Sequence, residues 1–183
     1  MTVIRPATDA DLPAVKALCA LVLPHLVKTN STPWDSRFGS GRTWQDPLLL
    51  VAVGQGGELV GFAAASPAFL QDHGLPVPWW CLDLVAVQPA FQGQHIGETL
   101  VLEVLRIADQ AGVSSLYGLC DPDLTGWYAH LGFTTTVPGA VLDTNVRVKG
   151  DDEDMSFAAP EDQCFIVTDI CDDPLPRLFI QPC

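Results

Sequence analysis

The stretch LVAVQPAFQGQHIG, residues 84–97, decides the fold. It continues an apolar strand, passes through a turn that contains Pro and Gly, and enters a helix near Ile96. The N–H groups of a first helical turn lack intrahelical partners, and the helix dipole favours negative charge there. Gly93 and Gly97 permit close backbone approach or unusual dihedral angles. The pattern predicts a phosphate-binding turn, with an ordinary strand-to-helix connection as the alternative.

Alternating strands and helices surround this stretch and predict an α/β fold with one mixed sheet flanked by helices. The first helix opens after Thr8 or Asp9, either of which can cap it, and ends near Pro24. The last two apolar runs are expected to form a closing hairpin, and long loops are expected at residues 24–47 and 67–79. The other predicted helices are residues 91–112 and 121–131, and the predicted strands are residues 3–6, 48–53, 59–66, 80–87, 115–120, 164–170 and 177–180.

Length and charge limit the class of protein. The 183 residues fit a single domain, which we expect to span residues 1–183. A net charge of −13 argues against nucleic-acid binding and favours a cationic partner, or else only keeps the protein in solution. No apolar stretch reaches the roughly 20 residues of a membrane span, and the N-terminus lacks a signal-like segment. We therefore expect a cytoplasmic protein without membrane attachment.

The six cysteines are scattered along the chain. They lack the closely spaced pairs of a structural zinc site, so no metal site is expected. Cys164 and Cys171 are placed to meet across the predicted closing hairpin, but reduced thiols are the expected state in cytosol.

Three motifs in the chain match one family. Residues 87–100, VQPAFQGQHIGETL, resemble motif A of the GNAT acetyltransferase superfamily, V-x-P-x-[YF]-[RQ]-G-x-G-[IL]-G-x-x-L. Residues 120–133, CDPDLTGWYAHLGF, resemble the superfamily pattern N-P-x-A-x-x-x-Y-x-x-x-G-F. Residues 4–12, IRPATDADL, resemble a common opening of these proteins. The motifs occur in the family's order, and the resemblance runs from Val3 to Phe133.

The resemblance implies a GNAT fold and a cofactor site. The fold would have a central mixed, largely antiparallel sheet that splays between its fourth and fifth strands. Residues 134–183 would supply the C-terminal strands and an acidic loop. The backbone of Val85 and Val87 would pair with the pantetheine arm of acetyl-CoA. Asp121 replaces the usual Asn beside the cofactor, and the backbone amides of Gln92, Gly93, Gln94, His95, Ile96 and Gly97 would hold the pyrophosphate.

The same resemblance implies acetyl transfer by direct attack of a primary amine on the thioester. Tyr128 would act as the general acid for the departing thiolate, or else serve as a core aromatic against Phe133. Asp83 lies two residues before Val85 and therefore shares its face of the strand. Asp83 is a candidate general base or anchor for the substrate ammonium, since partial burial raises the pKa of a carboxyl. The alternative is that Asp83 binds a backbone amide or an Arg.

Several residues depart from the family pattern. His95 stands where the family has Gly, Gln92 and Gln94 carry no charge, and Glu98 adds a negative charge at the helix start. These changes weaken the electrostatic part of the site, although a protonated His95 would compensate. Asp121 can still cap the following helix. They leave open a GNAT-like acyl-CoA-binding or protein-interaction module. Another nucleotide-binding α/β protein is less favoured, because G-x-G-x-x-G and G-x-x-x-x-G-K-[ST] are absent.

The acceptor is expected to be a cationic amine such as a polyamine, an aminoglycoside-like compound or a protein N-terminus. Selection among these would fall to the loops at residues 24–47, 67–80 and 140–163. Trp34 and Trp44 would line that pocket or only pin their loop, and the acidic residues 151–154 form either a solvated loop or a cation-attracting one. The apolar C-terminal runs permit a homodimer.

Overall fold

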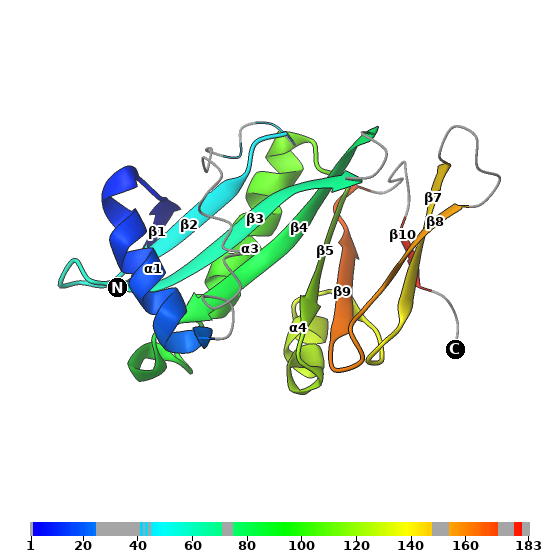
Figure 1. Cartoon of the computed structure of the whole chain (residues 1–183). Coiled ribbons are helices and arrows are strands. Elements are labelled where there is room, and N and C mark those ends of the chain that lie inside the picture. The colour runs from blue at the N-terminus through cyan, green and yellow to red at the C-terminus, as the bar shows by residue number, and fades with distance from the viewer. Residues whose placement is uncertain are drawn as a thin grey trace. The chain divides into compact units, whose positions relative to one another are not determined.

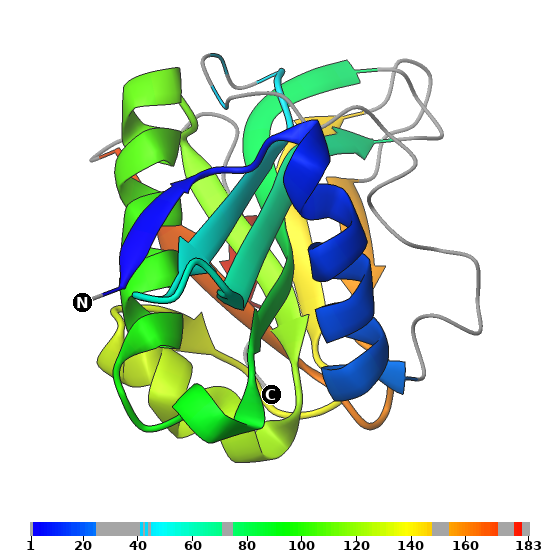
Figure 2. The same cartoon turned by 90° about the vertical axis from the view of Figure 1, so that its left-hand side faces the viewer.

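The computed structural model of the chain describes residues 2–24, 41, 43, 45–70, 75–147, 154–171 and 178–180. Figure 1 shows its elements, and Figure 2 shows them turned by 90°. The labelled helices are α1 (Leu12–Val22), α3 (Ile96–Ala111) and α4 (Thr125–His130). The strands are β1 (Val3–Pro6), β2 (Leu48–Val53), β3 (Leu59–Leu70), β4 (Leu75–Val87), β5 (Ser115–Cys120), β6 (Thr134–Thr135), β7 (Val141–Arg147), β8 (Asp154–Ala158), β9 (Cys164–Asp169) and β10 (Leu178–Ile180).

The described strands form two sheets. One has the order β1-β2-β3-β4-β5-β9-β6, and a smaller one has the order β10-β7-β8. β4 and β5 are parallel neighbours, whereas β1–β2, β2–β3, β5–β9 and β6–β9 are antiparallel pairs. This mixed sheet with helices between its strands confirms the predicted α/β class.

The chain divides into two compact units. Unit 1 comprises Met1–Ser66 and Leu82–Ala111, and unit 2 comprises Pro67–Cys81 and Gly112–Cys183. β3 and β4 contribute residues to both units, so each unit is described by itself below. The expectation of one domain over residues 1–183 stays a prediction.

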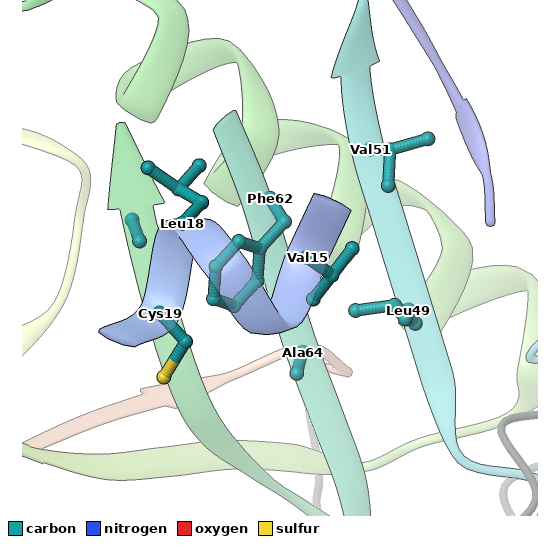
Figure 3. Close-up of a cluster of buried hydrophobic side chains, with 8 residues drawn as sticks. Val15, Leu18, Cys19, Leu49, Val51, Phe62 and Ala64 are labelled. Carbon is teal, nitrogen blue, oxygen red and sulfur yellow. The ribbon is translucent and has the colours of Figure 1, made fainter. Parts of the chain in front are cut away.

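In unit 1, α1 packs on one face of β2 and β3. Figure 3 shows Val15, Leu18 and Cys19 of α1 against strand side chains that alternate along their chains, as one face of a sheet requires: Leu49, Val51, Phe62 and Ala64. All of these side chains are buried. Because fully burying a side chain of this size stabilises a fold by about 1.5–3 kcal/mol, this cluster is a major part of the unit's stability.

The start of α1 is held by a carboxylate. Thr8 caps a short 3-10 turn, Asp9–Asp11, that leads into α1. The N–H and the hydroxyl of Thr8 both donate to Oδ2 of Asp11 at 2.7 Å. Arg5 donates to both carboxylate oxygens of Asp11, at 2.8 and 2.9 Å. Thr8 therefore occupies the N-cap position of this turn, but it does not cap α1 with its own side chain, because its hydroxyl donates to Asp11.

We expect Asp11→Asn to lower the free energy of unfolding by about 1–2 kcal/mol at neutral pH. The hydrogen bond from Arg5, and then those from Thr8, hold the pKa of Asp11 well below its usual range. A depressed folded-state pKa adds stability above the unfolded pKa of about 3.9, and that stability is lost as the pH falls through the folded pKa. The gain is modest, because 40% of the Arg5 side chain is exposed.

Chemical denaturation between pH 3 and pH 7 measures this effect, with Asp9→Asn as the matched control. Asp9 is an exposed acid in the same turn. We expect it to change the free energy of unfolding by less than about 0.5 kcal/mol. Equal losses for both variants, or a loss at Asp11 that does not shrink towards pH 3, would contradict this account.

In unit 2, β5 and β9 pair antiparallel from Ser115↔Asp169 to Cys120↔Cys164. The hydroxyl of Ser115 donates to Oδ1 of Asp169 at 2.9 Å, which fixes one end of the pair. α4 contacts β6 and β9. A buried cluster of Leu142, Ala159, Phe165 and Val167 joins the β7–β8 region to β9.

The predicted loop at residues 67–79 is wrong, because β3 continues to Leu70 and β4 begins at Leu75. The prolines in this stretch suggested a break in the sheet. However, the register of β2 with β3 ends at Leu48↔Ala65, so Pro67 lies beyond the last β2 partner. A missing N–H costs little where a strand has no neighbour on that side.

The predicted closing hairpin is also wrong. β9 pairs with β5 and β6, whereas β10 pairs with β7 in the smaller sheet. Cys164 and Cys171 therefore do not face each other across a hairpin, and both are free thiols. β6, β7 and β8 were absent from the predicted element order.

Three other expectations concern loops and membranes. Asp154 begins β8 and so does not belong to an acidic loop, while residues 151–153, Trp34 and Trp44 lie outside the described residues. In the described part of the chain, none of the helices is both long enough and apolar enough to cross a membrane.

Candidate active site

The end of β4 presents two different faces. Leu84 and Ala86 join the α1 cluster, so Asp83, Val85 and Val87 lie on the opposite face of the strand. Oδ2 of Asp83 is buried. Val85 and Val87 are half-buried. The three residues predicted to act from this strand therefore share one face.

The turn after β4 is held by glutamine side chains and backbone bonds. Gln88 donates from its N–H to the carbonyl of Val60 at 2.8 Å and from Nε2 to the carbonyl of Leu59 at 2.6 Å. Gln92 Nε2 donates back to the carbonyl of Val87 at 3.2 Å. These contacts fix the end of β4 and the turn that follows it to β3.

Two residues in the left-handed region then direct the chain into α3. Gly93 has φ +74° and the non-glycine residue His95 has φ +59°. The carbonyl of His95 accepts the first helical bond, from the N–H of Thr99 at 3.0 Å, and a second from the Thr99 hydroxyl at 2.8 Å. His95 is therefore the N-cap residue, and the N–H groups of Ile96, Gly97 and Glu98 precede the first intrahelical bond.

This turn has the room that an anionic group needs. Gln92, Gly93, Gln94 and His95 are all exposed, and a Cβ placed at Gly93 would meet nothing within 4 Å. The space beside Gly93 is therefore open to a ligand. The residues fit a pyrophosphate group bound through backbone N–H donors.

Gly61 of β3 is a residue of this region that the sequence analysis missed. A Cβ at Gly61 would lie 3.0 Å from the carbonyl oxygen of Ala86 and 3.3 Å from both Ile96 Cγ2 and Leu100 Cδ1. The absence of a side chain therefore lets the first turn of α3 pack directly on the sheet. A glycine inside an apolar strand was the available signal.

In unit 2, Asp121 follows β5 and is exposed. The prediction that its carboxylate caps the next helix is wrong, because the side chain makes no capping hydrogen bond. Its backbone carbonyl instead accepts the N–H of Leu124 at 2.9 Å and begins the 3-10 turn Pro122–Leu124. Pro122 fixes this turn without a side-chain cap.

Tyr128 of α4 has a buried ring. Its ring packs edge-to-face on Trp127 and Phe133, with centroids 4.7 and 5.5 Å apart. Burial, and then the neighbouring Cys120, raise the pKa of the Tyr128 hydroxyl, which stays protonated at working pH. The structure thus supports the packing role weighed for Tyr128 and leaves its hydroxyl available as a proton-bearing donor.

One comparison assigns the family. The model described as the Acetyltransferase (GNAT) family matches residues 18–133, more than half of the chain. The chain belongs to the GNAT acetyltransferase family. The family predicted from the three motifs is therefore confirmed, and acetyl-CoA is the typical acetyl donor of that family.

Two curated relatives carry the name uncharacterized N-acetyltransferase ycf52. The one from Gracilaria tenuistipitata var. liui is 30% identical over 81 residues, which are 44% of this chain and 41% of the relative. The one from Pyropia yezoensis is 32% identical over 76 residues, which are 42% of this chain and 40% of the relative. The chain spans about 40% of the length of these relatives.

Solved structures share the GNAT fold at low sequence identity. The GNAT family N-acetyltransferase YhbS from Escherichia coli, in complex with CoA, has a TM-score of 0.61 and 23% identity over 94% of this chain and 83% of that one. The ribosomal-protein-S18-alanine N-acetyltransferase from Escherichia coli has a TM-score of 0.59 and 17% identity over 96% and 97%. A PaiA N-acetyltransferase from Thermoplasma acidophilum, in complex with coenzyme A, has a TM-score of 0.60 and 13% identity over 92% of this chain and 99% of that one.

Within this GNAT turn, two of the residues that depart from the family pattern contact each other. Nδ1 of His95 lies 2.7 Å from Oε2 of Glu98. The imidazole is 81% exposed and the Glu98 side chain 30% exposed. The negative charge that was expected to oppose a phosphate therefore has a histidine partner three residues earlier in the same turn.

Proposed function

We propose that this chain is an N-acetyltransferase that moves the acetyl group of acetyl-CoA to a primary amine. The observation that carries the proposal is the turn between β4 and α3. Its two left-handed residues, Gly93 and His95, lead into a helix whose first amides are free to donate. Such a turn binds a pyrophosphate through backbone N–H groups and the helix dipole. YhbS and PaiA, which share the fold, were each crystallised with CoA.

In this proposal each residue of the turn has a defined part. The amides of residues 92–97 hold the pyrophosphate, and the backbone of Val85 and Val87 pairs with the pantetheine arm and polarises the thioester carbonyl. Asp121, which follows β5, takes the place beside the cofactor that an Asn usually has in the family. Because donation is by main-chain groups, the missing Arg and Lys side chains reduce affinity without removing the site.

Tyr128 is proposed as the acid for the departing thiolate. A phenol is a weaker acid than a thiol, and burial raises the pKa of Tyr128 further. Full proton transfer to the sulfur is therefore uphill, and the main contribution is a hydrogen bond to the charge that develops on it. A donor that stays protonated gives this help equally across neutral pH.

Asp83 is proposed to take the proton that the attacking amine must lose. We expect Asp83→Asn to lower kcat/KM for the amine about 100-fold at neutral pH and to leave acetyl-CoA affinity within about twofold. The acidic limb of the pH–rate profile should disappear with the carboxylate. Steady-state kinetics against pH measure both effects.

The exposed Asp109 of α3 provides the control for Asp83, since Asp109→Asn changes the same charge outside the site. A rise confined to the KM of the amine would assign Asp83 to anchoring the substrate ammonium. Unchanged kinetics would contradict both roles.

We propose a cationic amine as the acceptor. The net charge of −13 gives the protein a field that attracts cations. The S18-alanine N-acetyltransferase named above acts on a ribosomal protein, which keeps protein N-termini among the candidates with polyamines and aminoglycoside-like compounds. A cytoplasmic location, independence from nucleic acids and membranes, and a homodimer formed through the C-terminal strands belong to the same proposal.

One observation favours a second candidate function. Residues 43–105, which include the whole turn, contain no Lys or Arg. A GNAT-like module that binds acyl-CoA weakly and serves a protein partner would have such a turn. Calorimetric titration with acetyl-CoA, followed by CoA release over an amine panel, separates the two. Binding with amine-dependent CoA release supports the enzyme, and binding without release supports an acyl-CoA-binding module. No binding at millimolar acetyl-CoA removes the enzyme and leaves a protein-interaction module.

A further inference from the structure

We propose that His95 takes up a proton when this turn binds the pyrophosphate of acetyl-CoA, and that Glu98 positions the imidazole for that contact. This inference rests on the proposed function and adds a side-chain contact and a pH dependence to it. The contact would make acetyl-CoA affinity decrease with rising pH, unlike a site made only of backbone amides.

Basic side chains are scarce in the sequence around this turn. His95 and His73 are the only side chains within residues 43–105 that can carry a positive charge. The same range holds six acidic residues: Asp46, Glu58, Asp72, Asp83, Glu98 and Glu103. A pyrophosphate bound in such a setting gains strongly from any nearby cation. His95 lies in the turn itself.

The contact with Glu98 determines which nitrogen of the imidazole can meet a phosphate. Its Nδ1 is 2.7 Å from Oε2 of Glu98, and a carboxylate can only accept. Nδ1 therefore carries a hydrogen in both the neutral and the charged ring. In the neutral ring Nε2 is then a bare acceptor, which repels a phosphate oxygen. In the charged ring Nε2–H is a donor, so a phosphate contact at Nε2 requires a proton.

The imidazole of His95 is accessible to a ligand. Its side chain is 81% exposed, and Nε2 makes no hydrogen bond to another described residue. As the N-cap residue it lies beside the free amides of Ile96 and Gly97. The ring and these amides can therefore contact one anion together.

Few other charged groups belong to the described elements next to this turn in the chain. On α3, Glu103 and Arg106 pair with each other at 2.7 Å. Asp83 is the charged residue of the described part of β4, and Glu58 is that of the β2–β3 turn. Among described side chains, Glu98 is the partner of His95.

Two possible roles of Glu98 predict opposite effects of the Glu98→Gln substitution on acetyl-CoA affinity. If its charge simply repelled the phosphates, Glu98→Gln would strengthen acetyl-CoA binding at every pH. If it orients the imidazole and stabilises its charge, Glu98→Gln will weaken binding, and we expect about a 3–10-fold loss at pH 7.5. Glu103→Gln is the matched control, because Glu103 is 31% exposed and also pairs three residues along α3. We expect no change in affinity from it.

The experiment is calorimetry with two ligands. Titrations with acetyl-CoA measure its affinity between pH 6 and 8.5. Titrations with dephospho-CoA in two buffers of different ionisation enthalpy measure proton uptake. Dephospho-CoA is used because it lacks the 3′-phosphate, which itself titrates. We expect the wild-type protein to take up a fraction of a proton near pH 7.5 and its affinity to fall by up to about tenfold per pH unit. His95→Asn tolerates the left-handed backbone and should abolish both effects.

The results of these titrations can overturn the role of His95 and Glu98 separately from the proposed function. Acetyl-CoA binding without proton uptake, or a Glu98→Gln variant that binds more tightly than wild type, would overturn the role of this pair and leave the proposed function intact. No binding of acetyl-CoA to the wild-type protein would remove the proposed function and this inference together.

Discussion

Replacing Tyr128 with Phe is expected to lower kcat about 100-fold while acetyl-CoA affinity stays within about twofold. The change removes one hydroxyl and keeps the ring that packs on Trp127 and Phe133. The free energy of unfolding should therefore change by less than about 1 kcal/mol. The hydroxyl of Tyr128 stays protonated, since burial raises its pKa, so the loss should be similar from pH 6 to 9. Single-turnover kinetics and chemical denaturation measure these effects.

Phe133→Leu provides the structural control for Tyr128→Phe. It disturbs the ring packing around Tyr128, and we expect it to cost about 1–2 kcal/mol of stability. If Tyr128 served only as a core aromatic, Tyr128→Phe would leave kcat at the wild-type level. That result would remove its role at the departing sulfur.

The second large effect is expected at Gly61. Replacing it with Val should lower the free energy of unfolding by about 2–3 kcal/mol, because the new side chain meets the Ala86 carbonyl, Ile96 and Leu100. Ile96 and Leu100 belong to the first two turns of α3, so the helix start must move away from the sheet. We therefore also expect acetyl-CoA affinity to fall about tenfold or more in the fraction that stays folded.

Gly126→Ala is the control for Gly61→Val. A Cβ at Gly126 in α4 meets nothing within 4 Å, and alanine favours a helix. We expect Gly126→Ala to be neutral or to stabilise the fold by up to about 1 kcal/mol. Denaturation and calorimetry of both variants test the account. A Gly61→Val protein with wild-type stability and affinity would show that the close approach of α3 does not matter.

Several elements of the fold could be predicted from local sequence alone. β2 and β5 were expected with the bounds that they have, because each is an apolar run between turn-forming residues. The strand–turn–helix unit around residues 84–97 was predicted because its glycines and its apolar periodicity agree with each other. Family membership followed from the same residues.

Other elements depend on distant partners that the sequence does not display. Pro67 suggested a loop, yet it lies in β3 past the last β2 partner. β10 pairs with β7 and not with β9, a choice between neighbours that periodicity cannot make. For this reason the small β10-β7-β8 sheet was missed.

Local sequence likewise predicts some features of the candidate site and not others. His95 stands where the family has Gly, and its φ of +59° lies in the region that glycine favours. The His95–Glu98 contact is a three-residue spacing at a helix start, but whether the two side chains meet depends on rotamers. The role of Gly61 requires β3, β4 and α3 to meet at one point. No local pattern contains that information.

The central claim is that the amides between β4 and α3 bind acetyl-CoA, and an amide-resolved NMR titration of the ¹⁵N-labelled protein tests it most directly. We predict that the largest shift changes on adding acetyl-CoA occur at the N–H groups of Gly93, Gln94, His95, Ile96 and Gly97, with smaller changes at Val85 and Val87. The amides of Thr8–Asp11, which are not part of the proposed site, should not shift. Saturable changes elsewhere with none in residues 93–97, or an unchanged spectrum at millimolar acetyl-CoA, would contradict the account.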